Sequence, residues 1–325
     1  MRTKRKWIVF LIGFIAFTLA GTSLSTAASD YPARAIEVII PVAAGGGLDF
    51  AMNLFKSRVE KVLGQPLVFI YKPGAAGATG TLFATGCKPD GYTLVASTIS
   101  TLVIPPLTKK SAGYTLDDFV PICNLTSIPQ VFCIKDDSPY KTMQDFIKAA
   151  KTKKMKYATP GTFTNAHILM EAFSKMAGFQ AIHIPYAGSS AGMAAVLGGH
   201  IDMLVAASGG FLGPGKLRLL AIADVEQKRL EDHPTIPTLN ELGYPLPIGS
   251  LDGLWAPKGT PKEMANKIYE AHKKAYEENR GEINKLAKVG DQTVFLTTGE
   301  ELRRLYQVQH EFYKKMLGEM GALIK

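Results

Sequence analysis

Two glycine-rich turns are the parts of the chain best suited to holding an anion. The first is Pro41–Asp49 (PVAAGGGLD), which lies between a β-rich run at 36–42 and a helical pattern that ends at Gly64. Adjacent glycines let the backbone approach a ligand closely, and the following helix directs free N–H groups and a positive dipole end at the turn. A carboxylate can bind there without any lysine. The ligand-binding candidates of this turn are Val42, Ala43, Ala44, Gly45, Gly46 and Asp49.

The second turn, 159–167 (TPGTFTNAH), also lies between a strand-like run and a helix, and it adds hydroxyl groups. Simpler roles are open for three side chains of the two turns. Asp49 can stabilise its own helix, and Thr164 can be an N-cap. His167 has no metal-ligand spacing around it and can be a structural histidine. The candidates of the second turn are Gly161, Thr162, Phe163, Thr164 and His167.

The elements that carry these turns form a repeat. Strand, glycine turn, helix, strand, glycine turn, small-residue helix and strand occur in this order at 36–97 and again at 156–206. Alternating strands and helices predict parallel sheets with crossover helices, hence two similar α/β lobes. Because ligands of such sheets bind beyond the carboxyl ends of strands, Thr98 and Ser208 are also candidates. Further strands are expected at 217–223 and 254–257, and amphipathic helices at 261–279 and 299–318.

Several function classes lack their signatures in this chain. No Lys-Ser/Thr pair directly follows the glycines, and their spacing is not Gly-x-Gly-x-x-Gly, so nucleotide sites are not expected. There is no Gly-x-Ser-x-Gly elbow and no His-Glu-x-x-His helix. Without a Lys/Arg block that could track phosphates, nucleic acid is not an expected partner. We therefore expect a binding protein rather than an enzyme, with no cofactor and no metal.

The first 28 residues have the layout of a secretory signal peptide. Four basic residues precede an uncharged apolar run at 7–20, and small residues follow; cleavage is expected after Ala27 or Ala28. An uncleaved anchor is the alternative, although the apolar run is short for a membrane span. Removal of the segment lowers the formal net charge from +9 to +5. No cysteine lies near the junction, so a lipid-anchored form is not expected.

Three cysteines, Cys87, Cys123 and Cys133, have a spacing that suits no zinc site. The last two lie in apolar runs separated by Ser127-Ile128-Pro129. If these runs pair as antiparallel strands, the two sulfurs can form a disulfide in an oxidising compartment. Three buried free thiols are the equally weighted alternative.

Taken together, seven segments resemble the Bug family, the solute receptors of tripartite tricarboxylate transporters. They cover nearly the whole mature chain in the order typical of that family. The segments are YPARAIEVIIPVAAGGGLD, GQPLVFIYKPGAAGATG, KPDGYTL, HIPYAGSSAGMAAVLGGHIDM, GKLRLLAI, HPTIPTLNELGY and LWAPKGTP.

The resemblance implies a periplasmic-binding-protein-like fold, in which two lobes joined by two crossing strands close on a ligand. Lobe 1 is expected at 29–122 and 252–325, and lobe 2 at 123–251, with hinge passages near 120–126 and 250–256. The two glycine-rich turns are expected to grip a carboxylate, partly through water. The expected partners are this ligand and the inner-membrane subunits of a transporter, and the expected protein is a periplasmic monomer.

Three departures from the family pattern reduce polarity near the expected site. Phe163 stands where the family keeps a glycine, Ile104 precedes Pro105 where an asparagine is common, and Ala187 replaces a frequent lysine. We therefore expect a ligand less polar than citrate, such as an aromatic or short aliphatic monocarboxylate. Two other functions stay open: a ligand receptor for a sensory membrane kinase, and a secreted hydrolase or isomerase.

Overall fold

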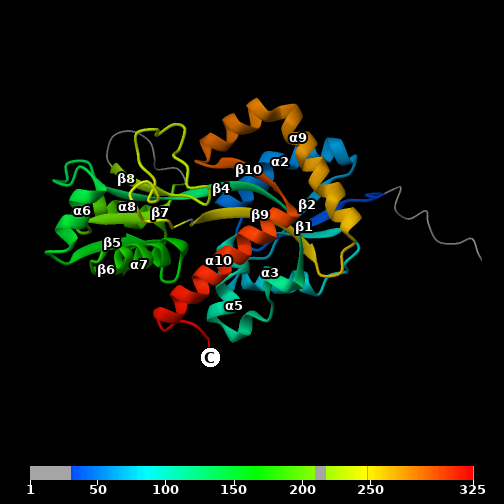
Figure 1. Cartoon of the computed structure of the whole chain (residues 1–325). Coiled ribbons are helices and arrows are strands. Elements are labelled where there is room, and N and C mark those ends of the chain that lie inside the picture. The colour runs from blue at the N-terminus through cyan, green and yellow to red at the C-terminus, as the bar shows by residue number, and fades with distance from the viewer. Residues whose placement is uncertain (1–30, 209–216, 247, 325) are drawn as a thin grey trace, which may run out of the picture.

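The computed structural model describes residues 31–208, 217–246 and 248–324, which form two α/β lobes (Figure 1). The predicted signal peptide lies outside these residues. No helix in the described part of the chain has the length and apolar character needed to cross a membrane. The predicted mixed α/β fold with two lobes is confirmed.

The first lobe contains the first unit of the predicted repeat. Its central strand β1 pairs in parallel with β2 and β3. The first crossover helix, α2, buries an apolar face and ends at Gly64, whose left-handed backbone (φ 68) lets its N–H donate to the Glu60 carbonyl. The elements, in chain order, are β1 (Ile36–Ile40), α2 (Gly47–Leu63), β2 (Leu67–Tyr71), η1 (Ala75–Gly77), α3 (Ala78–Thr85), β3 (Thr93–Ser97), α4 (Ile99–Leu102), α5 (Ile104–Thr108), η2 (Lys110–Ala112) and η3 (Leu116–Asp118).

The second lobe repeats this arrangement, as predicted. Its central strand β5 pairs in parallel with β6 and β7, and helices make both crossovers. The elements are α6 (Met143–Ala150), β5 (Met155–Thr159), α7 (Asn165–Ala177), β6 (Ala181–Pro185), α8 (Ser189–Leu197), β7 (Met203–Ala207) and β8 (Leu217–Ala223). Asp202 precedes β7 and links it to β5, because its Oδ2 accepts the N–H of Lys156 in β5 at 2.7 Å.

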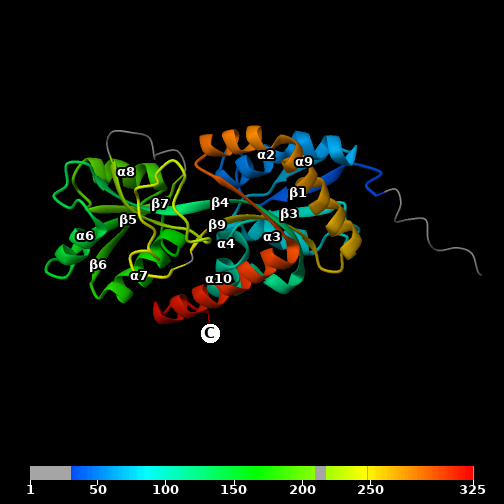
Figure 2. The same cartoon turned by 45° about the horizontal axis from the view of Figure 1, so that its top comes forward.

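Two long antiparallel strands, β4 (Phe119–Lys135) and β9 (Gly249–Pro257), connect the lobes (Figures 1 and 2). Up to Pro129, β4 pairs with β9, and from Gln130 onward it pairs with β7 and β8. The change of partner therefore falls just beyond the first predicted hinge passage. The lobe boundaries and the hinge stay predictions.

Of the two alternatives for the cysteines, the hairpin between the two cysteine-bearing runs does not occur and the free thiols are found. Cys123 and Cys133 lie on the single continuous strand β4, and all three cysteines are free. Ten residues of extended strand separate the two by roughly 33 Å, whereas a disulfide needs Cα atoms within about 7 Å. A proline in this strand is tolerated because Pro129 sits where β4 exchanges one partner for another.

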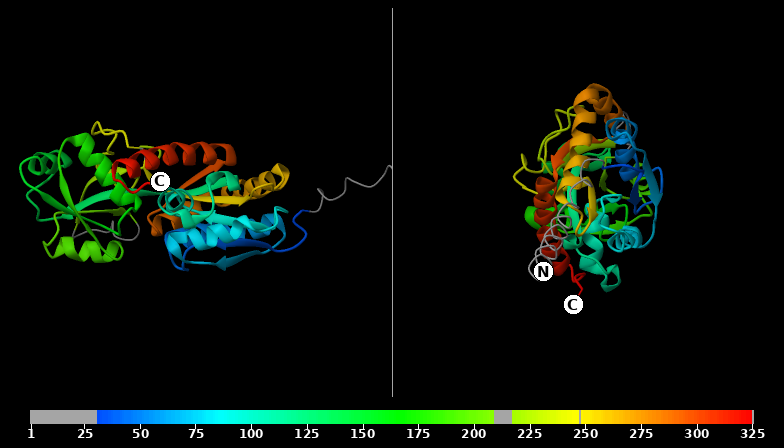
Figure 3. Two further views of the ribbon diagram at one scale, coloured as in Figure 1. Left: turned by 90° about the horizontal axis from the view of Figure 1, so that it is seen from below. Right: turned by 90° about the vertical axis from the view of Figure 1, so that its right-hand side faces the viewer.

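The C-terminal elements pack back onto both lobes. They are α9 (Lys262–Val289), β10 (Thr293–Thr298), which pairs with β4, and α10 (Gly299–Glu319). Figure 3 shows α10 running along the two lobes. Its buried side chains Tyr313 and Leu317 belong to the same apolar core as Phe173 of α7, and Lys175 Nζ lies 2.9 Å from Glu319 Oε2.

Candidate functional site

The segments that follow β3 in the first lobe and β5 in the second lobe are in contact. Beyond β3, the Ser100 hydroxyl in α4 donates to Oδ1 of Asn165 at 3.3 Å, and Asn165 begins α7 beyond β5. The predicted candidates beyond these two strands, Thr98 and the turn before α7, are thus brought together from opposite lobes.

The first glycine turn is exposed from Ala43 to Gly47, with Val42 half-buried at its base. Asp49, however, is buried and fully engaged. Its Oδ2 accepts the Gly45 N–H (2.7 Å), and its Oδ1 accepts the Tyr71 hydroxyl (2.8 Å) and the Asn53 amide (2.8 Å). The carboxylate therefore holds the turn through the Gly45 N–H, while the turn residues themselves stay exposed.

The second turn is also braced from within. Thr164 is the N-cap of α7, since its hydroxyl accepts the His167 N–H (3.4 Å), and it donates to the Gly161 carbonyl (3.0 Å). Nδ1 of His167 accepts the Phe163 N–H at 3.0 Å. Burial lowers the pKa of His167 to about 4, so the ring is neutral at physiological pH. The structural roles considered for Thr164 and His167 are both present.

Phe163 adopts a left-handed backbone conformation (φ 58) that bulky residues rarely take. Its ring is partly buried and tilted against the His167 ring, with centroids 5.8 Å apart. Thr162 is exposed beside it. The first turn of α7 leaves N–H groups without intrahelical acceptors at this end, so backbone donors and one exposed hydroxyl face the site.

Thr98 and Ser208 have structural partners as well. Thr98 forms a capping box with Thr101 at the start of α4. Ser208 is fully buried, and its hydroxyl donates to the Asp291 carbonyl at 3.0 Å. Ser208 therefore joins the end of β7 to the turn between α9 and β10.

Sequence reasoning missed that turn altogether. Gln292 is buried, and its Nε2 donates to the Gly47 carbonyl at 2.8 Å. The α9–β10 turn thus contacts the first glycine turn through Gln292 and the second lobe through Asp291 and Ser208. A repeat search could not have found it, because neither α9 nor β10 belongs to a repeat unit.

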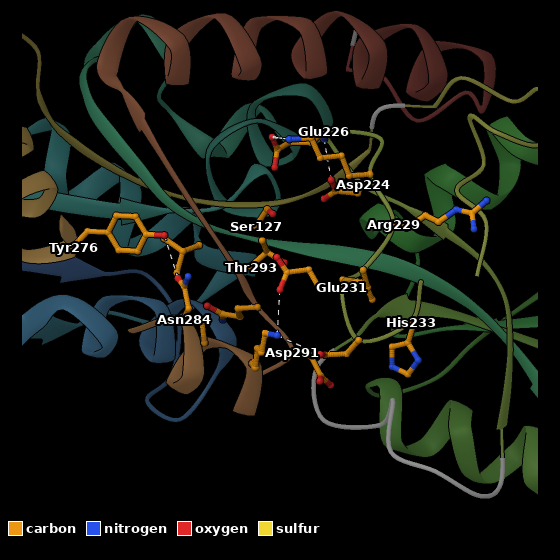
Figure 4. Close-up of a pocket in the computed structure, with 17 residues that line it drawn as sticks. Ser127, Asp224, Glu226, Arg229, Glu231, His233, Tyr276, Asn284, Asp291 and Thr293 are labelled. Carbon is orange, nitrogen blue, oxygen red and sulfur yellow. Dashed lines mark hydrogen bonds and ion pairs between the residues drawn. The ribbon is translucent and has the colours of Figure 1, made fainter. Parts of the chain in front are cut away.

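A charged cavity of about 480 Å³ lies on the other side of this turn, between the α9–β10 region and the segment after β8 (Figure 4). None of the predicted candidates lines it. Its cations are already paired: Lys288 Nζ lies 3.2 Å from both Glu231 and Asp232, and Lys228 pairs with Glu226. Since Lys288 belongs to α9 and its two acidic partners to the segment after β8, these ion pairs join the two walls. A wall with its cations neutralised is poorly suited to binding a free carboxylate.

No group of side chains suited to a metal ion occurs in the part of the chain that the structure describes. The site therefore offers an anion backbone N–H groups, hydroxyls and helix N-termini from two lobes, rather than a metal or a lysine. Nδ1 of His167 is already used on a backbone N–H of the turn.

Comparison with known proteins identifies the family. The family model TctC, described as "Tripartite tricarboxylate transporter family receptor", matches residues 53–322. A UPF0065 protein from Cupriavidus necator is 37% identical over 281 residues, covering 84% of this chain and 85% of the relative. Protein BugT from Bordetella pertussis is 28% identical and covers 98% of both chains. The resemblance to the Bug family is thereby confirmed.

Solved structures agree on the fold. A TctC solute-binding protein from Polaromonas, solved without ligand, has a TM-score of 0.79 at 30% identity, over 89% of this chain and 99% of the other. A protein from Rhodopseudomonas palustris bound to adipate has a TM-score of 0.74 at 22% identity, over 90% and 98%. Another from that organism, bound to malate, has a TM-score of 0.66 at 21% identity, over 88% and 100%.

Proposed function

Because the chain belongs to the family of tripartite tricarboxylate transporter receptors, we propose that it is a periplasmic receptor that captures a small carboxylate between its lobes and delivers it to a membrane transporter without catalysis. The observation that supports this most is the Ser100–Asn165 hydrogen bond, which joins the start of α4 in the first lobe to the start of α7, directly after the second turn. Structurally similar proteins hold adipate and malate.

The carboxylate would be held by groups that need no charge of their own. Backbone N–H groups at the starts of α2 and α7 carry partial positive charge, and water excluded between closed lobes strengthens each hydrogen bond. The proposed ligand-facing groups are the backbone of Ala43–Gly46 with Val42, the Thr162 hydroxyl, and the turn around Gly161 and Phe163. The apolar Phe163 favours a ligand less polar than citrate.

The first experiment is a thermal-shift screen with adipate, malate, citrate and benzoate, followed by calorimetry on the best of them. A ligand at 100 times its dissociation constant adds about 2.7 kcal/mol to the free energy of unfolding. Stoichiometric binding with the ligand recovered unchanged is expected. Conversion of any of these acids would contradict a receptor that does not catalyse.

Gly46→Val tests the first turn. A Cβ at Gly46 would meet only the Ala43 carbonyl oxygen, at 3.7 Å, so the fold tolerates it, whereas the side chain would stand where the ligand approaches. Affinity should fall by well over tenfold. Unchanged binding by the folded variant would remove this turn from the site.

Small-angle scattering of the wild type should show a smaller radius of gyration with saturating ligand, and an unchanged radius would exclude closure.

A further inference from the structure

Two histidine rings lie stacked behind the second turn. His167, in the first turn of α7, and His183, in β6, have ring centroids 3.7 Å apart with an interplanar angle of 15°. The Tyr157 ring of β5 lies beside this pair, with its centroid 5.0 Å from that of His183 and 6.4 Å from that of His167, and interplanar angles of 28° to both. Three neighbouring elements therefore contribute to one aromatic cluster.

Each histidine is hydrogen-bonded to a different part of the turn. Nδ1 of His167 accepts the Phe163 N–H (3.0 Å). Nε2 of His183 lies 2.7 Å from the Thr159 hydroxyl, and that hydroxyl donates to the Gly161 carbonyl (2.9 Å). When the one proton of the hydroxyl is given to Gly161, Nε2 of His183 is the donor, and the neutral ring then carries its proton on Nε2.

These bonds favour one neutral form for each ring. His167 must leave Nδ1 unprotonated to accept the Phe163 N–H, and a neutral ring then carries its proton on Nε2. Two cationic rings at this separation would repel one another strongly. Burial lowers the pKa of His167 to about 4, and burial and the neighbouring His167 lower that of His183 to about 4, so both rings are neutral near pH 7.

The turn needs such support because its backbone is strained. Phe163 has a φ of 58, a conformation that costs an L-residue roughly 1–2 kcal/mol, and Gly161 has a φ of 150. The Phe163 N–H bonded to His167 belongs to the strained residue itself. Its neighbours along the turn are the groups proposed to face the carboxylate.

We propose that the stacked His167–His183 pair is a positioning element: it holds the turn 160–164 in its strained, ligand-ready conformation and does not contact the ligand. This rests on the proposed function for the role of the turn in binding. On this proposal His167, which the sequence made a candidate ligand residue, supports the turn from its inner side and does not bind the ligand.

The experiment compares His167→Leu with His167→Asn. Leucine fills space but cannot accept a hydrogen bond, whereas the asparagine carbonyl oxygen lies near the position of Nδ1. In His167→Leu, the Phe163 amide proton should exchange with solvent at least tenfold faster, and the affinity for adipate should fall at least tenfold. In His167→Asn, both values should stay within about threefold of the wild type.

A folded His167→Leu protein with wild-type exchange at Phe163 would overturn the proposal, as would an Asn variant as impaired as Leu. Nitrogen-15 spectra of labelled histidine must also show both rings neutral with the proton on Nε2. If adipate does not bind the wild type, the proposed ligand class fails, and the exchange and tautomer measurements still decide whether the pair holds the turn.

His183→Phe separates stacking from hydrogen bonding, since phenylalanine keeps an aromatic ring but cannot donate to Thr159. Faster exchange at the Gly161–Phe163 amides, with a melting temperature near that of the wild type, is expected. Unchanged exchange would assign His183 to packing alone and remove it from the positioning pair.

Discussion

Asp252 gives a test of the physical reasoning at the crossing of the two connecting strands. It lies on β9 opposite Thr126 of β4 and is completely buried. The Thr126 hydroxyl donates to its Oδ2 at 2.8 Å, while Oδ1 has no hydrogen-bond partner in the described structure. Burial raises the pKa of Asp252 from 3.8 to about 7, against the opposing effect of Thr126.

The direction of the pH effect follows from which form the folded state prefers. A raised pKa means that the folded protein binds the proton more tightly than the unfolded chain does. The resulting stabilisation is fully present below about pH 4 and is lost as the pH rises to about 7. A difference of about three pKa units corresponds to about 4 kcal/mol, and it needs no reduction for solvent screening because the group is fully buried.

Asp252→Asn removes this titration and keeps an oxygen that can accept from Thr126. Relative to the wild type, the variant should become more stable between pH 4.5 and pH 8 by up to about 4 kcal/mol in the free energy of unfolding. Urea denaturation followed by circular dichroism at several pH values measures this. A cost of the amide that does not depend on pH cancels when the stability difference between variant and wild type is compared across pH values. Asp137→Asn, at an exposed carboxylate, is the matched control. A stability difference that does not change with pH would refute the reasoning.

Three further predictions concern the turn, the thiols and the packing of glycines. Phe163→Gly should widen binding toward larger or more polar acids in the thermal-shift panel; an unchanged ranking would leave Phe163 a packing residue only. Ellman's reagent should titrate at most one thiol, Cys87, in the native protein and three after denaturation, whereas fewer than three would indicate a disulfide. Gly80→Ala should cost about 1–3 kcal/mol, because its Cβ would lie 2.6 Å from the Lys72 carbonyl oxygen. Gly281→Ala, in open space just after the kink of α9 at Asn279, should instead stabilise by up to about 1 kcal/mol, and calorimetric melting of both variants checks the pair.

The repeat units could be predicted closely because local signals determine their boundaries. Gly64 stops α2 where the sequence predicts, and the strand at 181–185 has its predicted bounds. Both depend on residues within a few positions of the boundary: a left-handed glycine and a β-rich run. The strand β4 was harder, since Ser127-Ile128-Pro129 has the composition of a turn. Only the exchange of partners between lobes, which is a long-range property, makes an uninterrupted strand possible there.

The candidate site was predictable as a set of turns but not as a set of contacts. The positions of both glycine turns at strand ends follow from the repeat. The partners of Asp49, Ser208 and Gly47 do not, since Tyr71, Asp291 and Gln292 come from other elements. The role of His183 was equally hidden, because only the pairing of β5 with β6 brings it beside Thr159.

The internal hydrogen bonds of the two turns affect how the proposed receptor would select its ligand. The two ionisable candidates, Asp49 and His167, each accept a hydrogen bond from a backbone N–H of their own turn. On the proposed function, backbone N–H groups and the Thr162 hydroxyl remain for the carboxylate, and any carboxylate can use these groups about equally well. Discrimination between acids must then come from the shape and polarity of the space beside these groups. On the proposed function, Phe163 therefore has more influence on specificity than any charged residue of the two turns.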